Sequence, residues 1–295
     1  MRALKINHQP KSFADYLVHE VLGYGAHSTI YKVLHPDEEK LYALKHVVVQ
    51  DRSHRRFIHQ VENEFEVAQR IDHRRVRRCH KLVRIRSLLQ TKEAWVIMDY
   101  IEGTSLFERK PNDLITLVLI FLRMARALQA FGDAGFVHAD IKPQNILRTS
   151  EGGVRVIDLG QACAIGTMKK RMQGTPDYIA PEQVLRRPIT SQTDMFNFGA
   201  TLYWALTDRN IPSLVQEDLK SLLSRRRPRM FFPPESYRPE IPSSLSLLVG
   251  ELLCTSPSDR PSDWTVVCNR LNLIWHQLQR RGAQKLSVCR ERLLR

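Results

Sequence analysis

Cysteine is scarce in this chain of 295 residues and follows no metal-binding pattern. The five cysteines are widely scattered, at Cys79, Cys163, Cys254, Cys268 and Cys289. Zinc sites use cysteine and histidine ligands at short spacings, and no C-x-x-C pair occurs here. We therefore expect reduced thiols and no structural zinc site.

Long apolar runs are absent too. The longest mostly apolar run covers residues 114–122 and is stopped by Arg123, whereas a helix that spans a bilayer needs about 20 apolar residues. We interpret the run as a buried helix and expect no membrane span. The first eight residues also lack the apolar core of a signal peptide, so we expect a cytoplasmic location.

Acidic residues are too few to balance the basic ones. The chain has 45 Lys+Arg against 31 Asp+Glu, a net charge of +14, and arginines gather within residues 74–78 and 225–229. Such clusters bind nucleic acid or anionic surfaces in some proteins, but no RNP motif or zinc-finger spacing supports nucleic-acid recognition. We favour a solvated basic surface and keep contact with nucleic acid or an anionic surface as the alternative.

Hydrophobic residues make up 43% of the chain, which is ordinary for a globular protein. The length suits one large domain or two lobes. Short β-type runs dominate up to residue 100 and helical patterns dominate from residue 112, so the sequence predicts a small β-rich lobe followed by a larger α-rich lobe. The elements expected in the first lobe are strands at residues 18–22, 29–33, 41–49 and 95–98 and a helix at residues 55–71.

The residues best suited to chemistry lie in two short motifs, H-x-D-x-K-x-x-N at residues 138–145 and D-x-G at residues 158–160. Asp140 supplies a carboxylate that can receive a proton. Asn145 and Asp158 supply oxygen ligands suited to Mg²⁺, a hard cation. Phosphoryl transfer depends mainly on holding such groups, the metal and the phosphates in one geometry.

Two further motifs complete an ordered set: Tyr-Ala-Leu-Lys at residues 42–45 and Gly-Thr-Pro-Asp-Tyr-Ile-Ala-Pro-Glu at residues 174–182. The set resembles the catalytic core of the eukaryotic-like (bacterial-type) serine/threonine protein kinase family. The resemblance implies an α+β, two-lobed protein kinase fold, with a small antiparallel β lobe that contains one helix and a larger, mainly α lobe. The implied segments are an N-terminal extension (1–12), a kinase domain (13–282) made of an N-lobe (13–98), a hinge (99–103) and a C-lobe (104–282), and a C-terminal tail (283–295).

The resemblance also assigns roles to the catalytic residues. It implies that Asp140 receives or orients the proton of the acceptor hydroxyl, while Lys142 neutralises charge on the moving phosphoryl group. The hydroxyl of Thr175 is expected to hydrogen-bond both of them. The implied cofactors are ATP and Mg²⁺, with Asn145 and Asp158 as the metal ligands.

Glycines between two strands predict the phosphate-binding turn. Gly23 and Gly25 allow backbone N–H groups to approach phosphates closely, although Ser28 replaces the third glycine of the usual pattern. Lys45, one strand later, is expected to pair with the phosphates. The other nucleotide contacts implied by the resemblance are Leu22, Ile30, Ala43, Met98, Asp99, Ile101 and Leu147.

The glutamate that holds Lys45 is chosen by helical phase from three candidates, Glu62, Glu64 and Glu66. The apolar stripe of the expected helix consists of Phe57, Val61, Phe65, Ala68 and Ile71. At about 100° per residue, only Glu64 falls inside this stripe. A carboxylate on a buried face needs a partner, and Lys45 is the natural one.

One departure from the family is Ala139, which stands where many kinases carry an arginine that clamps an activating phosphate. We therefore expect little control by phosphorylation of the activation segment, residues 158–182, and a nearly neutral Thr167→Ala substitution. An alternative is that Lys169, Lys170 and Arg171 clamp a phosphate instead.

Three further roles implied by the resemblance are structural. Asp194 is expected to anchor the backbone of the catalytic loop, at the start of a helix that is buried on all sides. Glu182 and Arg260 are expected to form a scaffolding ion pair. His138 is expected to pack beneath the metal-binding loop.

The sequence thus predicts a serine/threonine protein kinase that transfers the γ-phosphoryl group of ATP to protein hydroxyls. Lys142 and residues 174–176 resemble serine/threonine rather than tyrosine kinases. The expected partners are protein substrates, and the expected state is a monomer or weak dimer. Two alternatives stay open: a nucleotide-binding pseudokinase scaffold, and a small-molecule kinase of the aminoglycoside or choline type.

Overall fold

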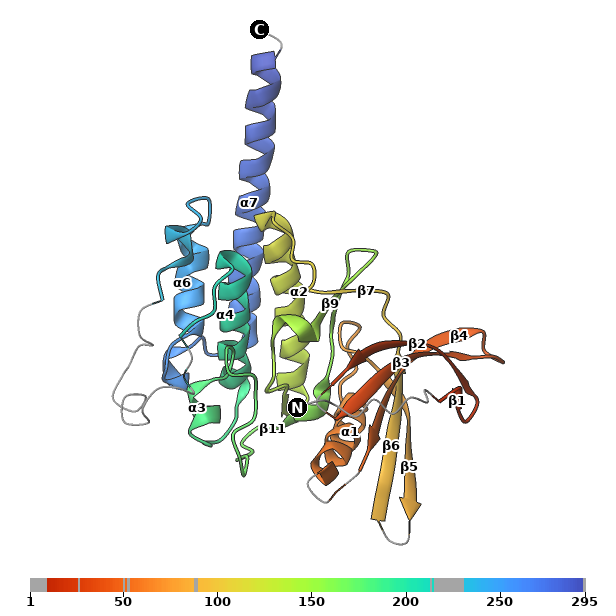
Figure 1. Cartoon of the computed structure of the whole chain (residues 1–295). Helices are drawn as coiled ribbons and strands as arrows, with labels where there is room; N and C mark the ends of the chain where they lie inside the picture. Colours follow the sequence, from red (N-terminus) through yellow and green to blue (C-terminus); the bar gives the residue numbers. More distant parts are fainter. Residues whose placement is uncertain are drawn as a thin grey trace. The chain divides into compact units, whose positions relative to one another are not determined.

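The chain folds into two units, the first built on an antiparallel sheet and the second mainly helical, which confirms the predicted α+β class and the division into a β-rich and an α-rich part (Figure 1). The first unit contains residues 1–69 and 77–102, and the second contains residues 70–76 and 103–295. The computed structural model describes residues 10–25, 27–49, 51, 54–87, 90–212, 214 and 231–293, with side chains up to residue 284. The basic cluster at residues 225–229, Cys289 as a side chain and most of the N-terminal extension lie outside this description.

The first unit is built on one antiparallel sheet of six strands in the order β1-β2-β3-β4-β6-β5. A single helix, α1 (Arg55–Ala68), packs against β4, β5 and β6. The strands are β1 (Ser12–Phe13), β2 (Tyr16–Tyr24), β3 (Ser28–His35), β4 (Lys40–Val48), β5 (Cys79–Ser87) and β6 (Gln90–Asp99).

Aromatic side chains form much of the core of this sheet. Aromatic and β-branched residues suit pleated, half-buried surfaces, and here rings from β1, β2, β3, β4 and β6 meet in one cluster. Its members are Phe13, Tyr16, Tyr31, Val33, Tyr42, Leu44, Trp95 and Ile97. β1 begins at Ser12, inside the segment expected to be an extension, because Phe13 is buried in this cluster.

The second unit is mainly helical. Its long helices are α2 (Leu114–Asp133), α4 (Ser191–Thr207), α6 (Ser243–Leu252) and α7 (Trp264–Leu293), with a short α3 (Pro181–Val184). Two small sheets hold the loops of the site, one of order β10-β9-β7 and one of β11 with β8. Their strands are β7 (Gly103–Ser105), β8 (Phe136–Val137), β9 (Ile146–Thr149), β10 (Val154–Val156) and β11 (Cys163–Ala164).

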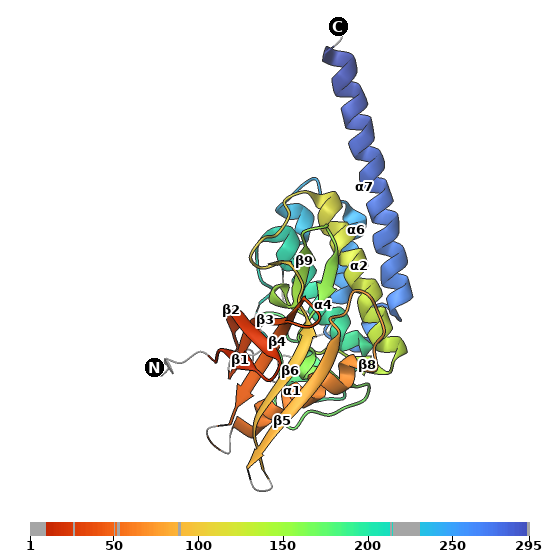
Figure 2. The ribbon, with the colours of Figure 1, turned by 90° about the vertical axis from the view of Figure 1, so that its right-hand side faces the viewer.

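Helices α2 and α4 form the centre of this unit. The side chain of Asp113 caps α2 by accepting a hydrogen bond from the backbone N–H of Thr116 at 2.7 Å. The expected burial of α4 on all sides is confirmed, since nearly every residue from Thr193 to Thr207 is buried. α7 packs along α2 and continues beyond it (Figure 2), so the helix does not end at the predicted boundary after residue 282.

The apolar character of α2 comes from its position in the core. Beyond the apolar run that ends at Arg123, the helix continues to Asp133, and its full 20 residues are long and apolar enough to cross a membrane by length and composition. However, 61% of that window is buried inside the protein.

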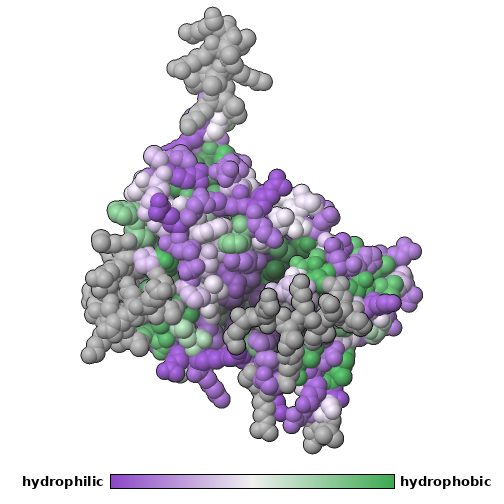
Figure 3. Space-filling model, viewed as in Figure 1, coloured by the Kyte–Doolittle hydropathy of each residue, from purple (hydrophilic) through white to green (hydrophobic). Residues whose placement is uncertain are grey.

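Hydrophilic side chains cover much of the face of the second unit drawn in Figure 3.

Candidate active site

Three side chains meet in the second unit: Asp140 and Lys142 from the catalytic loop, and Thr175 from the activation segment. The Oδ2 atom of Asp140 accepts a hydrogen bond from Lys142 Nζ at 2.9 Å, and its Oδ1 atom accepts one from Thr175 Oγ1 at 2.9 Å. Lys142 Nζ also donates to Thr175 Oγ1 at 3.0 Å. Both carboxylate oxygens of Asp140 are therefore held in place, which fixes the direction of the carboxylate.

Asn145 supports the same loop from behind. Its Nδ2 atom donates to the carbonyl oxygen of Asp140 at 2.9 Å, which leaves Oδ1 as the amide atom able to bind a cation. The backbone of Asn145 accepts a hydrogen bond from Ile157 N at 3.0 Å, so the residue before Asp158 is tied to the loop. Asp158 itself has left-handed backbone angles, with φ of 64°.

These two side chains fit a Mg²⁺ ion that also binds ATP phosphates. Mg²⁺ is usually held by one or two protein oxygen ligands together with phosphates and water. Among the described residues no group of three or more His, Cys, Asp or Glu side chains could hold a metal ion. A carboxylate and an amide oxygen, from Asp158 and Asn145, match the phosphate-assisted kind of site.

The backbone of the catalytic loop is anchored by Asp194, as predicted. Asp194 Oδ2 accepts from the N–H of His138 at 2.7 Å and Oδ1 accepts from the N–H of Ala139 at 2.8 Å. Complete burial raises the pKa of Asp194 from 3.8 to about 6, although the two backbone donors favour its charged form. His138 is buried and its Nε2 lies 3.1 Å from the carbonyl oxygen of Ile157, consistent with a structural role.

A residue that the sequence did not single out, Gln183, joins the catalytic loop to the activation segment. It is only 3% exposed, and its Nε2 donates to the carbonyl oxygens of Ala139 at 2.8 Å and Gln173 at 3.2 Å. Its Oε1 accepts from Ala180 N and Asn197 Nδ2, each at 2.9 Å. The buried side-chain amide of Gln183 thus holds the backbone at Ala139, just before Asp140, and at Gln173, two residues before Thr175.

Ala139 adopts a conformation that needs such support. Its φ is 62°, in the left-handed region, which costs a non-glycine residue about 1 kcal/mol or more. Its N–H donates to Asp194 Oδ1 and its carbonyl oxygen accepts from Gln183 Nε2, and these two hydrogen bonds hold it there.

The activation segment is held by side-chain hydrogen bonds within itself and by a backbone hydrogen bond with Ile189, which precedes α4. Thr167 Oγ1 donates to Ala164 O at 2.6 Å, and the carbonyl oxygen of Thr167 accepts from Ile189 N at 3.0 Å. Lys169 Nζ donates to Gln161 O at 2.9 Å. The hydroxyl of Thr167 and the ammonium group of Lys169, one of the three residues that could clamp a phosphate, are therefore both engaged with main-chain carbonyl groups.

The predicted ion pair between Glu182 and Arg260 is present and buried. The two guanidinium nitrogens contact the two carboxylate oxygens at 2.7 and 2.9 Å. Arg260 also donates to the carbonyl oxygen of Gln192 at 2.6 Å. Such a fully bonded, bidentate pair ties the end of the activation segment to the helical core.

In the first unit, Lys45 and Glu64 form the expected contact. Lys45 Nζ lies 2.7 Å from Glu64 Oε2, and the Glu64 side chain is 2% exposed. Glu62 instead pairs with Arg84 at 2.5 Å, and Glu66 is exposed.

The apolar stripe used to choose Glu64 was wrong at two positions. Phe57 and Phe65 are only half-buried, because they lie at the edges of the buried face. Phe57 stacks on His27, with ring centroids 4.1 Å apart. The face that is buried consists of Ile58, Val61, Glu64, Val67 and Ala68.

The glycine turn is closed by a hydrogen bond from Gly25 N to Ser28 O at 2.8 Å. A Cβ atom at Gly25 would lie 2.4 Å from Ser28 Oγ, so that hydroxyl would have to move, whereas Gly23 borders open space. The strand register places Ile30 opposite both Gly23 and Lys45. The turn thus stands next to the lysine expected to bind phosphates.

The remaining predicted nucleotide contacts are divided between the units. Ala43 and Met98 are opposite one another on β4 and β6, and each is 1% exposed. Leu22 is 43% exposed, and the carboxylate of Asp99 lies 2.7 Å from His80 Nε2. Ile101 also belongs to the first unit, while Leu147 lies on β9 of the second. Their roles in nucleotide binding stay predictions.

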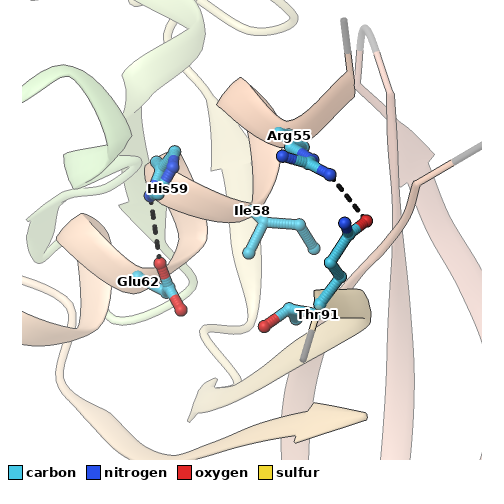
Figure 4. Close-up of a pocket in the computed structure, with 6 residues that line it drawn as sticks. Arg55, Ile58, His59, Glu62 and Thr91 are labelled. Carbon is cyan, nitrogen blue, oxygen red and sulfur yellow. Dashed lines mark hydrogen bonds and ion pairs between the residues drawn. The ribbon is translucent and has the colours of Figure 1, made fainter. Parts of the chain in front are cut away.

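A separate pocket lies between α1 and the start of β6 (Figure 4). Arg55 donates to Gln90 Oε1 at 2.6 Å across it, and His59 contacts Glu62 at 3.2 Å. None of the predicted catalytic or nucleotide-binding residues lines this pocket, whose walls are Arg55, Ile58, His59, Glu62, Gln90 and Thr91.

Comparison with known proteins agrees with this geometry. The probable serine/threonine-protein kinase PknB of Corynebacterium glutamicum is 27% identical over 183 residues, 59% of this chain and 28% of that protein. PknA of the same organism is 26% identical over 206 residues, covering 66% and 44%, and cAMP-dependent protein kinase type 3 of Saccharomyces cerevisiae is 25% identical over 249 residues, covering 81% and 59%.

The chain therefore spans between 28% and 59% of the length of these relatives. The family model described as the protein kinase domain matches residues 16–272, most of the chain. The matched range includes the catalytic loop, the activation segment and the Lys45–Glu64 pair. The chain belongs to the protein kinase domain family.

Proposed function

We propose that this protein is a serine/threonine protein kinase that transfers the γ-phosphoryl group of ATP to serine and threonine hydroxyls of protein substrates. The observation that carries the proposal is the triangle of Asp140, Lys142 and Thr175, in which all three pairs of polar groups lie within 3.0 Å. Phosphoryl transfer is catalysed chiefly by positioning and electrostatics, and this triangle supplies both.

Asp140 is the group placed to receive a proton. With its two oxygens held by Thr175 and Lys142, the carboxylate orients a substrate hydroxyl for in-line attack and takes up the proton that the hydroxyl loses. Lys142 stabilises the negative charge on the transferred phosphoryl oxygens. Because Thr175 and Lys142 bond each other as well as Asp140, loss of either one loosens the whole group.

Lys45 is the residue that orients the nucleotide phosphates. Glu64 holds its ammonium group at 2.7 Å on the buried face of α1. Asn145 and Asp158 would hold Mg²⁺, which would supply positive charge against the phosphates when it is bound with ATP.

Activity without phosphorylation of the activation segment is part of the proposal. Ala139 provides no cation for a phosphate, while Gln183 and the Glu182–Arg260 pair already bind the segment to the catalytic loop and the helical core. The hydroxyl of Thr167 is occupied by a main-chain carbonyl group.

The test is transfer of radiolabelled phosphate from ATP to generic protein substrates, followed by identification of the phosphorylated amino acid. The expected product is phosphoserine or phosphothreonine, formed only with Mg²⁺ and lost in Asp140→Asn. ATP binding without transfer would instead identify a pseudokinase scaffold, and labelling of small alcohols would identify a small-molecule kinase.

A further inference from the structure

Five arginines of the second unit form a cluster that none of the catalytic roles uses. We call them the arginine cluster: Arg74, Arg75, Arg123, Arg126 and Arg155. Two come from the loop at residues 70–76, two from α2 and one from β10. Three segments far apart in the sequence therefore contribute cations to one place.

The backbone explains why these segments meet. Val76 forms a parallel bridge with Val156, and Val156 N donates to the carbonyl oxygen of Arg75 at 2.7 Å, which brings Arg75 beside the strand of Arg155. Arg123 donates to the carbonyl oxygen of Gly152 at 2.6 Å and so ties α2 to the turn before β10. Arg126, three residues later, lies on the same face of α2.

The positive charges of the cluster outnumber the one acidic residue of the loop at 70–76, Asp72, which acts on His73 together with three of these arginines. None of the five arginines forms an ion pair within the described part of the chain, and the hydrogen bonds of Arg123 and Arg155 go to backbone carbonyl groups. Burial, followed by the four neighbouring arginines, lowers the pKa of Arg75 to about 10. The folded protein thus maintains mutual repulsion that a bound anion would relieve.

We propose that the arginine cluster binds a phosphorylated segment of a protein substrate. A guanidinium group matches the oxygens of a phosphate through two parallel hydrogen bonds, and all five cations are arginine rather than lysine. The cluster is compact, since it draws on one loop, one face of a helix and one strand. It suits one or two phosphate groups better than the extended backbone of a nucleic acid.

The inference rests on the proposed function, because the segment placed at the cluster belongs to the protein that the kinase would phosphorylate. The cluster would hold such a substrate through a segment that is separate from its acceptor hydroxyl. Binding needs neither ATP nor turnover, so it is measurable independently of catalysis.

The probe is a fluorescent peptide with two phosphoserines, titrated with the full chain and followed by anisotropy without ATP. The test variant is Arg74→Gln with Arg126→Gln, and the control is Arg280→Gln with Arg281→Gln on α7; all four side chains are exposed, and both pairs remove two charges. We expect the test variant to weaken binding at least tenfold and the control less than twofold.

Three results would overturn the proposal. These are equal losses in the two variants, equal affinity for the unphosphorylated peptide, and tighter binding to a DNA duplex or phosphatidylserine vesicles than to the phosphopeptide. Thermal unfolding checks that both variants are folded, and Arg75→Gln provides a second cluster variant with the same expected loss. Transfer to an unphosphorylated peptide should be unchanged in the test variant, and a chain that binds the phosphopeptide without any transfer would refute only the proposed catalytic function.

Discussion

The side-chain amide of Gln183 donates a hydrogen bond to the carbonyl oxygen of Ala139 at 2.8 Å, one residue before the catalytic carboxylate. The same nitrogen atom reaches the carbonyl oxygen of Gln173, two residues before Thr175. A single buried donor therefore sets the distance between the two parts of the active site. This arrangement supports the proposal that the activation segment is held without an arginine–phosphate clamp.

Gln183→Glu should lower kcat about 10- to 100-fold at neutral pH, with little change in the KM for ATP. The carboxylate would face two carbonyl oxygens and could not donate to them. Because burial raises the pKa of a carboxyl group, lowering the pH toward about 6 should restore one donor and recover part of kcat relative to wild type. Gln192→Glu is the matched control, since the side-chain amide of Gln192 bonds Ser262 and Thr190 rather than the catalytic loop; identical pH profiles for the two variants would contradict a positioning role.

Lys45→Met should reduce turnover more than it weakens ATP binding, because the lysine orients phosphates while other contacts hold the nucleotide. Glu64→Gln should give a milder form of the same defect. Glu62→Gln is the control on the same helix, since Glu62 pairs with Arg84 instead. Steady-state rates and nucleotide titrations separate the two effects, and a larger defect in Glu62→Gln would disprove the assignment of Glu64.

The burial of Asp194 predicts a dependence of stability on pH. Its pKa is about 6 in the folded protein against an ordinary 3.8, so the folded state holds this proton more tightly than the unfolded chain does. The resulting stabilisation of the folded state is on the order of 3 kcal/mol. It is fully present below about pH 4 and is lost as the pH rises through about 6. In urea unfolding, the stability of wild type relative to Asp194→Asn should fall over that range; a constant difference from pH 4 to 7 would contradict the raised pKa.

Treatment with a phosphatase should leave most of the activity intact, and Thr167→Ala should be nearly neutral. Thr175→Ala should instead be severe, because Thr175 bonds both Asp140 and Lys142. The measurement is the initial rate on one exogenous substrate, compared among untreated wild type, phosphatase-treated wild type and the two threonine variants. A roughly tenfold drop on dephosphorylation, about 1.4 kcal/mol in the barrier, would show that the activation segment is controlled by phosphorylation after all.

The parts of the site that could be predicted from the sequence are those whose groups lie close along the chain. The spacing of Asp140, Lys142 and Asn145 is fixed by one short loop, and helical phase was enough to select Glu64 despite two errors in its stripe. The order of the motifs also predicted the two-lobed fold.

Contacts that depend on tertiary packing could not be predicted in this way. Gln183 joins residues 139, 173 and 197, which only the folded chain brings together. The same is true of the arginine cluster, of which only Arg74 and Arg75 stood out as a local run. β5 was not among the expected strands, because most of its side chains are exposed and it lacks a clear alternation of apolar and polar residues.

The central claim is that Asp140 acts as the catalytic carboxylate of a phosphoryl transfer to protein hydroxyls. The most direct measurement is the single-turnover rate of phosphate transfer from ATP to a protein substrate, in wild type and in Asp140→Asn, with ATP affinity measured in parallel. We predict that the variant binds ATP normally and is at least about 100-fold slower, a loss of about 2.7 kcal/mol of transition-state stabilisation. Equal rates in the two proteins, or no transfer by wild type, would contradict it.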